Sequence, residues 1–388
     1  MYEKSLKTLE YDKIVNRLME MAASNLGREY AAELKPITDI DEIKENIEET
    51  DEAFTLIIKR GNPPLFGIKP ILMETKRVEM GGVLSPGGLL KISESLRVSK
   101  ALKKYMEETL KSDVNSEYPI IFGRIESLNV FPTIENAINN AIVSEDEISD
   151  NASVALRNIR RQITQKQNSV KTKLDSIVNS SDNKKYLQDS LVTMREGRYV
   201  VPVKQENRAN IPGLIHDTSS SGATLFVEPM AVVELNNDIK KLMIEEREEI
   251  EKILRELSNL VAEHSYEIGA NEFILKELDF AFAKGKLAMN MNGVKPTLND
   301  RGYTNIKKGR HPLLQVEKVV PIDIYLGDEF TTLVVTGPNT GGKTVTLKTI
   351  GLLTLMAQAG LFIPADYGSE IAVYDNVYAD IGDEQSIE

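Results

Sequence analysis

With 388 residues, 41% of them hydrophobic, the chain is long enough for two to four domains with apolar cores. It has no cysteine and only three widely separated histidines, which excludes disulfides, zinc fingers and thiol nucleophiles and disfavours a histidine-rich metal site. Its net charge of -12 argues against a protein that coats nucleic acid by bulk attraction, although phosphate contacts need only a local basic surface.

The N-terminal third predicts a mostly helical domain. The first residues are charged and contain no signal-peptide core, and no later run of apolar residues could span a bilayer. We therefore expect a cytoplasmic protein with no membrane contact. Residues 1–140 alternate helical spacing of apolar residues with proline- and glycine-rich joints, and contain no visible catalytic motif.

Two later stretches predict a pair of long helices. Apolar residues recur at mostly 4-3 spacing from Ile148 to Ile177, and again from Val232 to Ile268. Each pattern indicates a helix with a narrow apolar seam. An outgoing helix within 141–180 and a returning one within 231–295 should pack antiparallel. A buried bundle would explain either helix alone, whereas the pair is better explained as an arm.

The segment between these helices, residues 181–230, predicts a small β-containing unit. Residues 198–203 and 223–227 have the composition of strands, and 219–222 (Ser-Ser-Ser-Gly) has that of a turn. A β unit at the end of a helical pair suits the gripping of an extended polymer. A dimerisation arm would fit the same pattern.

Basic residues gather in the outgoing helix and the β unit. Residues 155–175 contain six basic residues and one acid, which a solvated helix face explains as readily as a nucleic-acid contact. If this region binds nucleic acid, the expected phosphate contacts come from Arg157, Arg160, Arg161, Lys184, Lys185, Arg198, Lys204 and Arg208.

The strongest motif is a phosphate loop of the pattern G-x-x-x-x-G-K-[ST]. Its residues are Gly337, Pro338, Asn339, Thr340, Gly341, Gly342, Lys343 and Thr344. Residues 331–336 predict a buried strand before the loop, and 345–359 a helix after it that ends at Gly360. Backbone N–H groups of such a loop face phosphate oxygens, and the helix N-terminus adds positive potential. We expect Lys343 to reach the β- and γ-phosphates of ATP, and Thr344 to bind Mg²⁺.

Hydrolysis of ATP needs more than this loop. A second carboxylate must hold Mg²⁺ after a buried strand, and another group must position water. Asp383-Glu384 resembles such a pair only superficially, because no buried strand precedes it, so we expect a surface loop there. We expect no catalytic residue within these 388 residues and an incomplete ATPase domain that binds nucleotide poorly and does not turn it over.

Three segments together resemble the MutS family: 309–314 (GRHPLL), 336–344 (TGPNTGGKT) and 360–365 (GLFIPA). The Gly-Pro-Asn-x-Gly-Gly-Lys loop is far more specific than a generic phosphate loop. Residues 198–203 and 216–229 are similar to one bacterial branch of that family, which lacks the mismatch-recognition and connector domains. The resemblance covers essentially the whole chain.

The resemblance implies a multidomain protein with ATP and Mg²⁺ as cofactors. Its expected parts are a mainly α core (1–140), antiparallel lever helices (141–180 and 231–295), a small β-containing clamp (181–230) and the first part of an α/β P-loop ATPase domain of ABC type (296–388). It also implies a homodimer formed through the ATPase domains, ATPase activity in the full-length protein, and a C-terminal nuclease-like domain beyond Glu388. By the same resemblance, Asn339 would contact phosphate and His311 would lie near the nucleotide.

Mismatch reading is not expected, because Phe226-Val227-Glu228 has the letters of the mismatch motif but lies in a predicted strand before Pro229. The resemblance implies an ATP-dependent clamp on branched or structured DNA that suppresses or processes homologous-recombination intermediates. The same branch also implies an ATP-dependent sensor or splitter of stalled or collided ribosomes, and the sequence does not separate DNA from ribosomal RNA. A chromosome-organising coiled-coil ATPase is disfavoured, because its coil follows the phosphate loop, whereas both helices precede the loop here.

Overall fold

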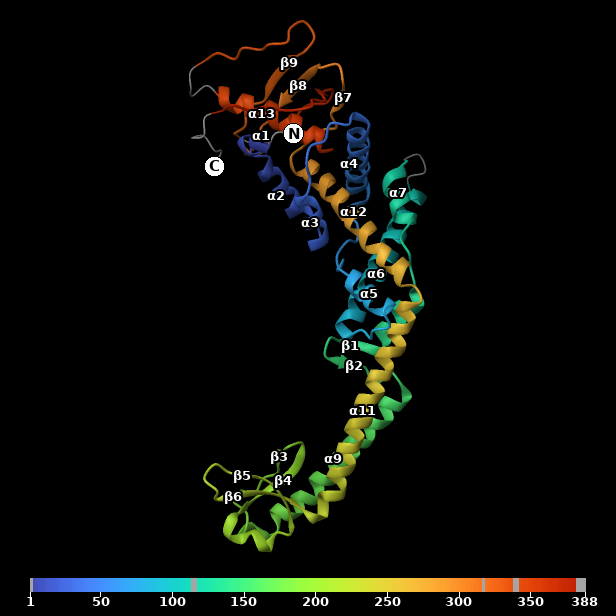
Figure 1. The fold of residues 1–388 in the computed structure, drawn as a ribbon, viewed down its shortest axis with the longest axis vertical. Helices are drawn as coiled ribbons and strands as arrows, with labels where there is room; N and C mark the ends of the chain where they lie inside the picture. The colour runs from blue at the N-terminus through green and yellow to red at the C-terminus, as the bar shows by residue number, and fades with distance from the viewer. Residues whose placement is uncertain (1–2, 113–116, 316–317, 338–341, 382–388) are drawn as a thin grey trace. The chain divides into compact units, whose positions relative to one another are not determined.

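A computed structural model describes residues 3–112, 117–315, 318–337 and 342–381 (Figure 1). They form two compact units. Unit 1 comprises Met1–Lys76, Lys91–Glu135 and His264–Glu388, and unit 2 comprises Arg77–Leu90 and Asn136–Glu263. Both are helix-rich with small sheets, in agreement with the expected mainly helical, multidomain chain. None of the helices described is long and apolar enough to cross a bilayer.

Unit 1 is built around packed helices. They are α1 (Glu3–Thr8), α2 (Tyr11–Met21), α3 (Asn25–Ala32), α4 (Ile40–Arg60), α7 (Pro119–Glu126), α12 (Ser265–Asn290) and α13 (Lys343–Gln358). Three further helices, α5 (Leu72–Glu79), α6 (Pro86–Ser112) and α8 (Pro132–Ala141), have residues in both units. Apolar clusters form the core of unit 1: one joins α2, α12 and α13, and another joins α4, α7 and α12. Helices α4 and α12 approach closely at Gly285. A Cβ atom there would lie 2.8 Å from the backbone nitrogen of Phe54, so a larger side chain would push the helices apart.

Local sequence explains where α4 begins and ends. The side chain of Asp39 accepts hydrogen bonds from the backbone N–H groups of Asp41 and Glu42, at 3.0 and 3.1 Å. Acidic residues occupy the first turn and basic residues the last, as the helix dipole favours. The helix stops at Gly61, whose φ of 80° is accessible mainly to glycine.

Unit 1 also contains a four-stranded sheet in the order β7-β10-β8-β9. Its strands are β7 (Thr297–Asn299), β8 (Thr304–Gly309), β9 (Ile322–Leu326) and β10 (Glu370–Ala372). The predicted strand at 331–336 is wrong, because this segment is not a strand and Leu333 and Val334 are 42% and 77% exposed. A buried strand needs hydrogen-bonding neighbours, and none of the strands described pairs with this segment.

Unit 2 contains two long helices, α9 (Val154–Asn179) and α11 (Met230–Ala262), which lie side by side (Figure 1). Contacts that join Ser153 to Glu249 and Lys166 to Asp238 show that they run antiparallel, as predicted. The outgoing helix begins later than the spacing indicated, because residues 142–148 contain a short hairpin of β1 (Ile142–Ser144) and β2 (Glu147–Ile148). Ser153 then caps α9 by accepting from the N–H of Leu156.

The seam between α9 and α11 is apolar. Buried residues of α9 recur seven or four positions apart, at Leu156, Ile163, Val170, Leu174 and Val178. The first buried residue of α9 is Leu156, whereas Ala155 is exposed and Ile159 is half-buried. The returning stretch is also two helices, since α11 ends at Ala262 and Ile268 belongs to α12.

A four-stranded antiparallel sheet, hereafter the unit 2 sheet, lies between α9 and α11 in the sequence. Its order is β3-β4-β6-β5, with β3 (Thr193–Arg195), β4 (Arg198–Lys204), β5 (Gly213–Thr218) and β6 (Thr224–Pro229). A short helix, α10 (Ser181–Lys184), precedes it, and a 3₁₀ turn, η1 (Gln205–Asn210), joins β4 to β5. The strands predicted at 198–203 and 223–227 therefore form. Val200, Val201 and Val203 of β4 are buried.

Candidate functional site

The phosphate loop leads directly into helix α13. Pro338, Asn339, Thr340 and Gly341 lie outside the described residues, as does the Asp383-Glu384 pair. Gly342 has a left-handed conformation, with φ of 80°, and Lys343 and Thr344 open the helix. The predicted helix is confirmed with its start two residues earlier, and Gly360 follows it with φ of 76°. N–H groups in the first turn of a helix have no intrahelical acceptor, which makes the start of α13 suitable for an anion.

Helix α13 is held by residues from the start of the chain. The Lys348 ammonium lies 3.1 Å from the Glu10 carboxylate, and both side chains are buried. Burial opposes ionisation of Glu10, but hydrogen bonds from Lys13 and Lys348 lower its pKa below the ordinary value. A Cβ atom at Gly351 would lie 2.8 Å from a methyl group of Leu9, so the contact is close.

His311 is buried near this ion pair. The residue is 2% exposed, and Nδ1 accepts from the N–H of Leu313 at 3.3 Å. Among the residues that the structure describes, Nε2 has no hydrogen-bond partner. Burial lowers the pKa of His311 to about 4, with Glu10 acting in the opposite direction and Lys348 in the same one. The ring is therefore neutral at pH 7, and its contact with nucleotide stays a prediction.

An apolar groove of 410 Å³ lies beside α13. Leu347 and Ile350 of the helix line it, together with Leu333 and Val335 of the segment that precedes the phosphate loop. The unpaired segment 331–336 therefore lies against α13 and contributes to the groove, although it forms no strand.

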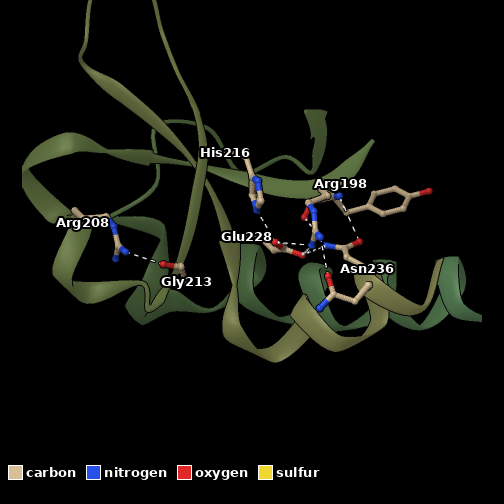
Figure 2. A network of polar contacts seen from close by, with 8 residues as sticks. Arg198, Arg208, Gly213, His216, Glu228 and Asn236 are labelled. Carbon is tan, nitrogen blue, oxygen red and sulfur yellow. Dashed lines mark hydrogen bonds and ion pairs between the residues drawn. The ribbon is translucent and has the colours of Figure 1, made fainter. Parts of the chain in front are cut away.

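The unit 2 sheet contains a polar network around Glu228, which is fully buried (Figure 2). Its carboxylate accepts from Nη1 of Arg198 at 2.8 and 3.0 Å and from Nδ2 of Asn236 at 2.7 Å. Nε2 of His216 lies 2.5 Å from the same carboxylate, and Arg198 also donates to Asn237 at 2.6 Å. The network therefore joins β4, β5, β6 and the start of α11.

An irregularity in strand pairing directs His216 toward this network. The register between β5 and β6 shifts between Ile215 and Asp217, so His216 has no opposite residue in β6. Such a bulge turns one side chain away from the regular alternation of a strand. At the other end of β5, a Cβ atom at Gly213 would lie 2.1 Å from the carbonyl oxygen of Glu228, so the strands meet there only because residue 213 is glycine.

The residues that resemble a mismatch motif are internal to unit 2. Glu228 is fully buried and bonded to Arg198, and the half-buried ring of Phe226 lies 4.2 Å below the guanidinium of Arg195. The Phe-x-Glu residues here contribute to the fold of unit 2. That they do not read mismatches stays a prediction.

The structure divides the predicted nucleic-acid contacts into two groups. Arg160 pairs with Asp150 and Glu246 at 2.5 and 2.7 Å, Arg198 pairs with Glu228, and Arg208 donates to the carbonyls of Ile211 and Gly213. The half-buried Lys204 donates to the Lys185 carbonyl. Arg157, Arg161, Lys184 and Lys185 are exposed. The guanidiniums of Arg160, Arg198 and Arg208 already make contacts within the fold, so we do not expect all eight residues to bind nucleic acid directly. The role of the exposed group stays a prediction.

Comparison with known proteins identifies the family. A family model described as MutS domain V matches residues 333–388. The chain is 55% identical to the endonuclease MutS2 of Alkaliphilus oremlandii and to that of Clostridioides difficile, and 49% identical to that of a Geobacillus species. Each alignment covers all of this chain and 49% of the relative. The chain belongs to the MutS family. It spans about half the length of the curated relatives that it matches.

Membership of the MutS family agrees with the resemblance of the phosphate loop and of the segments at 309–314 and 360–365. Residue 333, where the family model begins, lies just before the phosphate loop, and the match continues through α13. The alignments cover the whole chain, so the relationship extends to unit 2 as well.

Stability at acidic pH tests the burial of His311. Its pKa of about 4 in the folded protein is below the ordinary value of 6.5, so the unfolded chain binds the proton more readily. The stability contributed by the neutral ring is full above about pH 6.5 and is lost as the pH falls toward 4, by up to about 3 kcal/mol. We expect His311→Asn to lose less unfolding free energy than the wild type between pH 7 and 4.5 in urea titrations. The same pH slope in His311→Asn and wild type would contradict the account.

Loss of the Glu228 carboxylate should destabilise unit 2. Glu228→Gln leaves the mostly buried Arg198 without its counter-charge, and breaking such a pair costs about 3 kcal/mol. We expect hydrogen exchange of the β4 and β6 amides to accelerate correspondingly. The control Glu234→Gln changes an exposed residue of α11 and should stay within about 0.5 kcal/mol of wild type. Unchanged protection of β4 and β6 in Glu228→Gln would show that the network is dispensable.

Proposed function

We propose that this protein is an ATP-dependent clamp on branched or structured DNA that suppresses or processes homologous-recombination intermediates. The observation that carries the proposal is the presence, in one MutS-family chain, of the family's phosphate loop and of a small sheet joined to two long antiparallel helices. Such a sheet and helix pair suit the gripping of a long polymer. The curated relatives are named endonucleases, which are enzymes that act on nucleic acid. We infer that this protein also acts on nucleic acid.

The proposed nucleotide site is the start of α13. The left-handed Gly342 and the open first turn of the helix fit a bound phosphate group. Lys343 would reach the β- and γ-phosphates and Thr344 would hold Mg²⁺, while Pro338–Gly341 would complete the loop around the phosphates. ATP bound with Mg²⁺ supplies a hydrolysable phosphoanhydride.

The remaining parts of the proposal concern the whole protein. We infer that it dimerises through its ATPase domains and hydrolyses ATP, and that a nuclease-like domain accompanies the clamp. No residue proposed here for catalysis lies within these 388 residues, and we expect them alone to show negligible ATPase turnover. In this scheme the lever helices are α9 and α11 and the clamp is the unit 2 sheet.

Replacement of the loop lysine tests the nucleotide site. Lys343→Ala in the whole protein removes a charge-assisted contact to phosphate and should weaken binding of a fluorescent ATP analogue by about 30- to 100-fold, equivalent to about 2 to 3 kcal/mol. The circular dichroism spectrum should be unchanged. Lys318→Ala changes an exposed lysine of the same unit and should bind as wild type. Nucleotide affinity retained by Lys343→Ala would exclude the proposed role.

Competition binding tests the choice of polymer. At physiological salt, the whole protein should bind a fluorescent four-way DNA junction tightly, and neither linear duplex nor purified collided ribosomes in equal amount should displace it. Displacement by ribosomes alone, or no junction binding, would contradict the recombination function. Either result would favour the second function implied by the same branch of the family, the sensing or splitting of stalled or collided ribosomes.

A further inference from the structure

Helix α9 has a row of polar side chains along one face. The row consists of Arg157, Arg161, Thr164, Asn168 and Lys171, all exposed. They are four, three, four and three residues apart, a spacing that places them on one side of a helix. The row is about 21 Å long at 1.5 Å per residue. No acidic residue lies anywhere in the chain between its two ends.

Among the described residues, no carboxylate pairs with the three cations of this row. Arg157 donates to the neutral side-chain oxygen of Asn151 at 2.6 Å, which leaves the guanidinium without a counter-charge. Arg161 and Lys171 make no hydrogen bond or ion pair within the part of the chain that the structure describes. A run of three cations that repel one another weakly is explained more simply by an anionic ligand than by the stability of the helix.

The other basic residues of α9 serve the fold. Arg160 pairs with Glu246 and Lys166 with Asp238, each at 2.7 Å, and Lys173 donates to the carbonyl of Ala231 at 3.2 Å. All of these partners belong to α11. The basic residues of α9 thus form two sets: one faces α11, and the other faces away from α11.

Helix α11 has the opposite charge balance. It contains eight acidic and five basic residues, whereas α9 contains one acidic and six basic residues. Exposed acids of α11 include Glu234, Glu248 and Glu256. Since the two helices are packed side by side in unit 2, a polyanion is attracted to the face of α9 and repelled by that of α11.

The residue types in the row indicate the class of ligand that it binds. Between its cations the row contains Thr164 and Asn168. The amide of Asn168 can donate to phosphate oxygens, whereas the hydroxyl of Thr164 already donates to the carbonyl of Arg160 at 2.9 Å. The row contains no aromatic residue on which an unpaired base could stack, and no apolar anchor of the kind that dominates protein–protein interfaces. These donors therefore fit a sugar–phosphate backbone contacted without regard to base sequence.

We propose that Arg157, Arg161, Thr164, Asn168 and Lys171 form a docking surface for the phosphate backbone of duplex DNA. This inference rests on the proposed function, and it assigns part of the DNA contact to a helix that leads to the unit 2 sheet as well as to the sheet itself. The same proposal assigns no DNA contact to α11.

A matched pair of triple variants tests the surface in the whole protein. The row variant is Arg157→Glu, Arg161→Glu and Lys171→Glu; the control is Lys240→Glu, Arg247→Glu and Arg255→Glu, exposed cations of α11. Both change the net charge equally. The row variant should bind a fluorescent duplex or four-way junction at least 10-fold more weakly, and its plot of log affinity against log salt should be shallower by about 2 to 3. The control should stay within about twofold of wild type.

Each outcome decides between the alternatives. Equal losses in both variants would indicate a general charge effect and overturn the row, and so would wild-type binding by the row variant. If the wild type itself bound no DNA, the proposed function and the row would both be overturned. A loss of ribosome binding alone would also overturn the row as a DNA surface. Arg157→Gln, Arg161→Gln and Lys171→Gln, which add no repulsion within the helix, should weaken DNA binding in the same direction if the row is correct.

Discussion

The contact between Arg198 and the buried carboxylate of Glu228 is the constraint on which the arrangement of unit 2 depends. Glu228 is fully buried, and its carboxylate is balanced by the guanidinium of Arg198 and hydrogen-bonded to Asn236. A carboxylate this deep is tolerated only when it is paired and its oxygens are satisfied. Because the partners come from two strands and a helix, the requirement to satisfy one charge also determines how the sheet joins α11.

The same rule of pairing separates structural from available cations on the helix pair. Arg160 and Lys166 of α9 face acids of α11 and neutralise them, so neither is available to a ligand without breaking an internal contact. Arg157, Arg161 and Lys171 face away from α11 and keep their charge. A chain with a net charge of -12 can thus present a basic surface to DNA, because its acids are concentrated elsewhere, including on α11.

Sequence patterns predicted features that depend on neighbouring residues. The glycine, lysine and threonine of the phosphate loop indicated the start of α13 to within two residues, and apolar spacing indicated both α9 and α11. Features that depend on distant residues were missed. Arg198 and Glu228 are 30 positions apart, so their ion pair has no local signal. Residues 331–336 have the composition of a buried strand, but composition does not reveal whether neighbouring strands are present.

Site-specific photocrosslinking to DNA would test the central claim, that α9 and the unit 2 sheet hold the polymer. A photoreactive residue replacing Gln165 or Ser221 places the probe on the exposed face of α9 or in the turn between β5 and β6, and one replacing Glu248 places it on α11. With a labelled four-way junction and the whole protein, the account predicts crosslinks from positions 165 and 221 and few or none from position 248. Equal crosslinking from position 248, or none from 165 and 221, would contradict it.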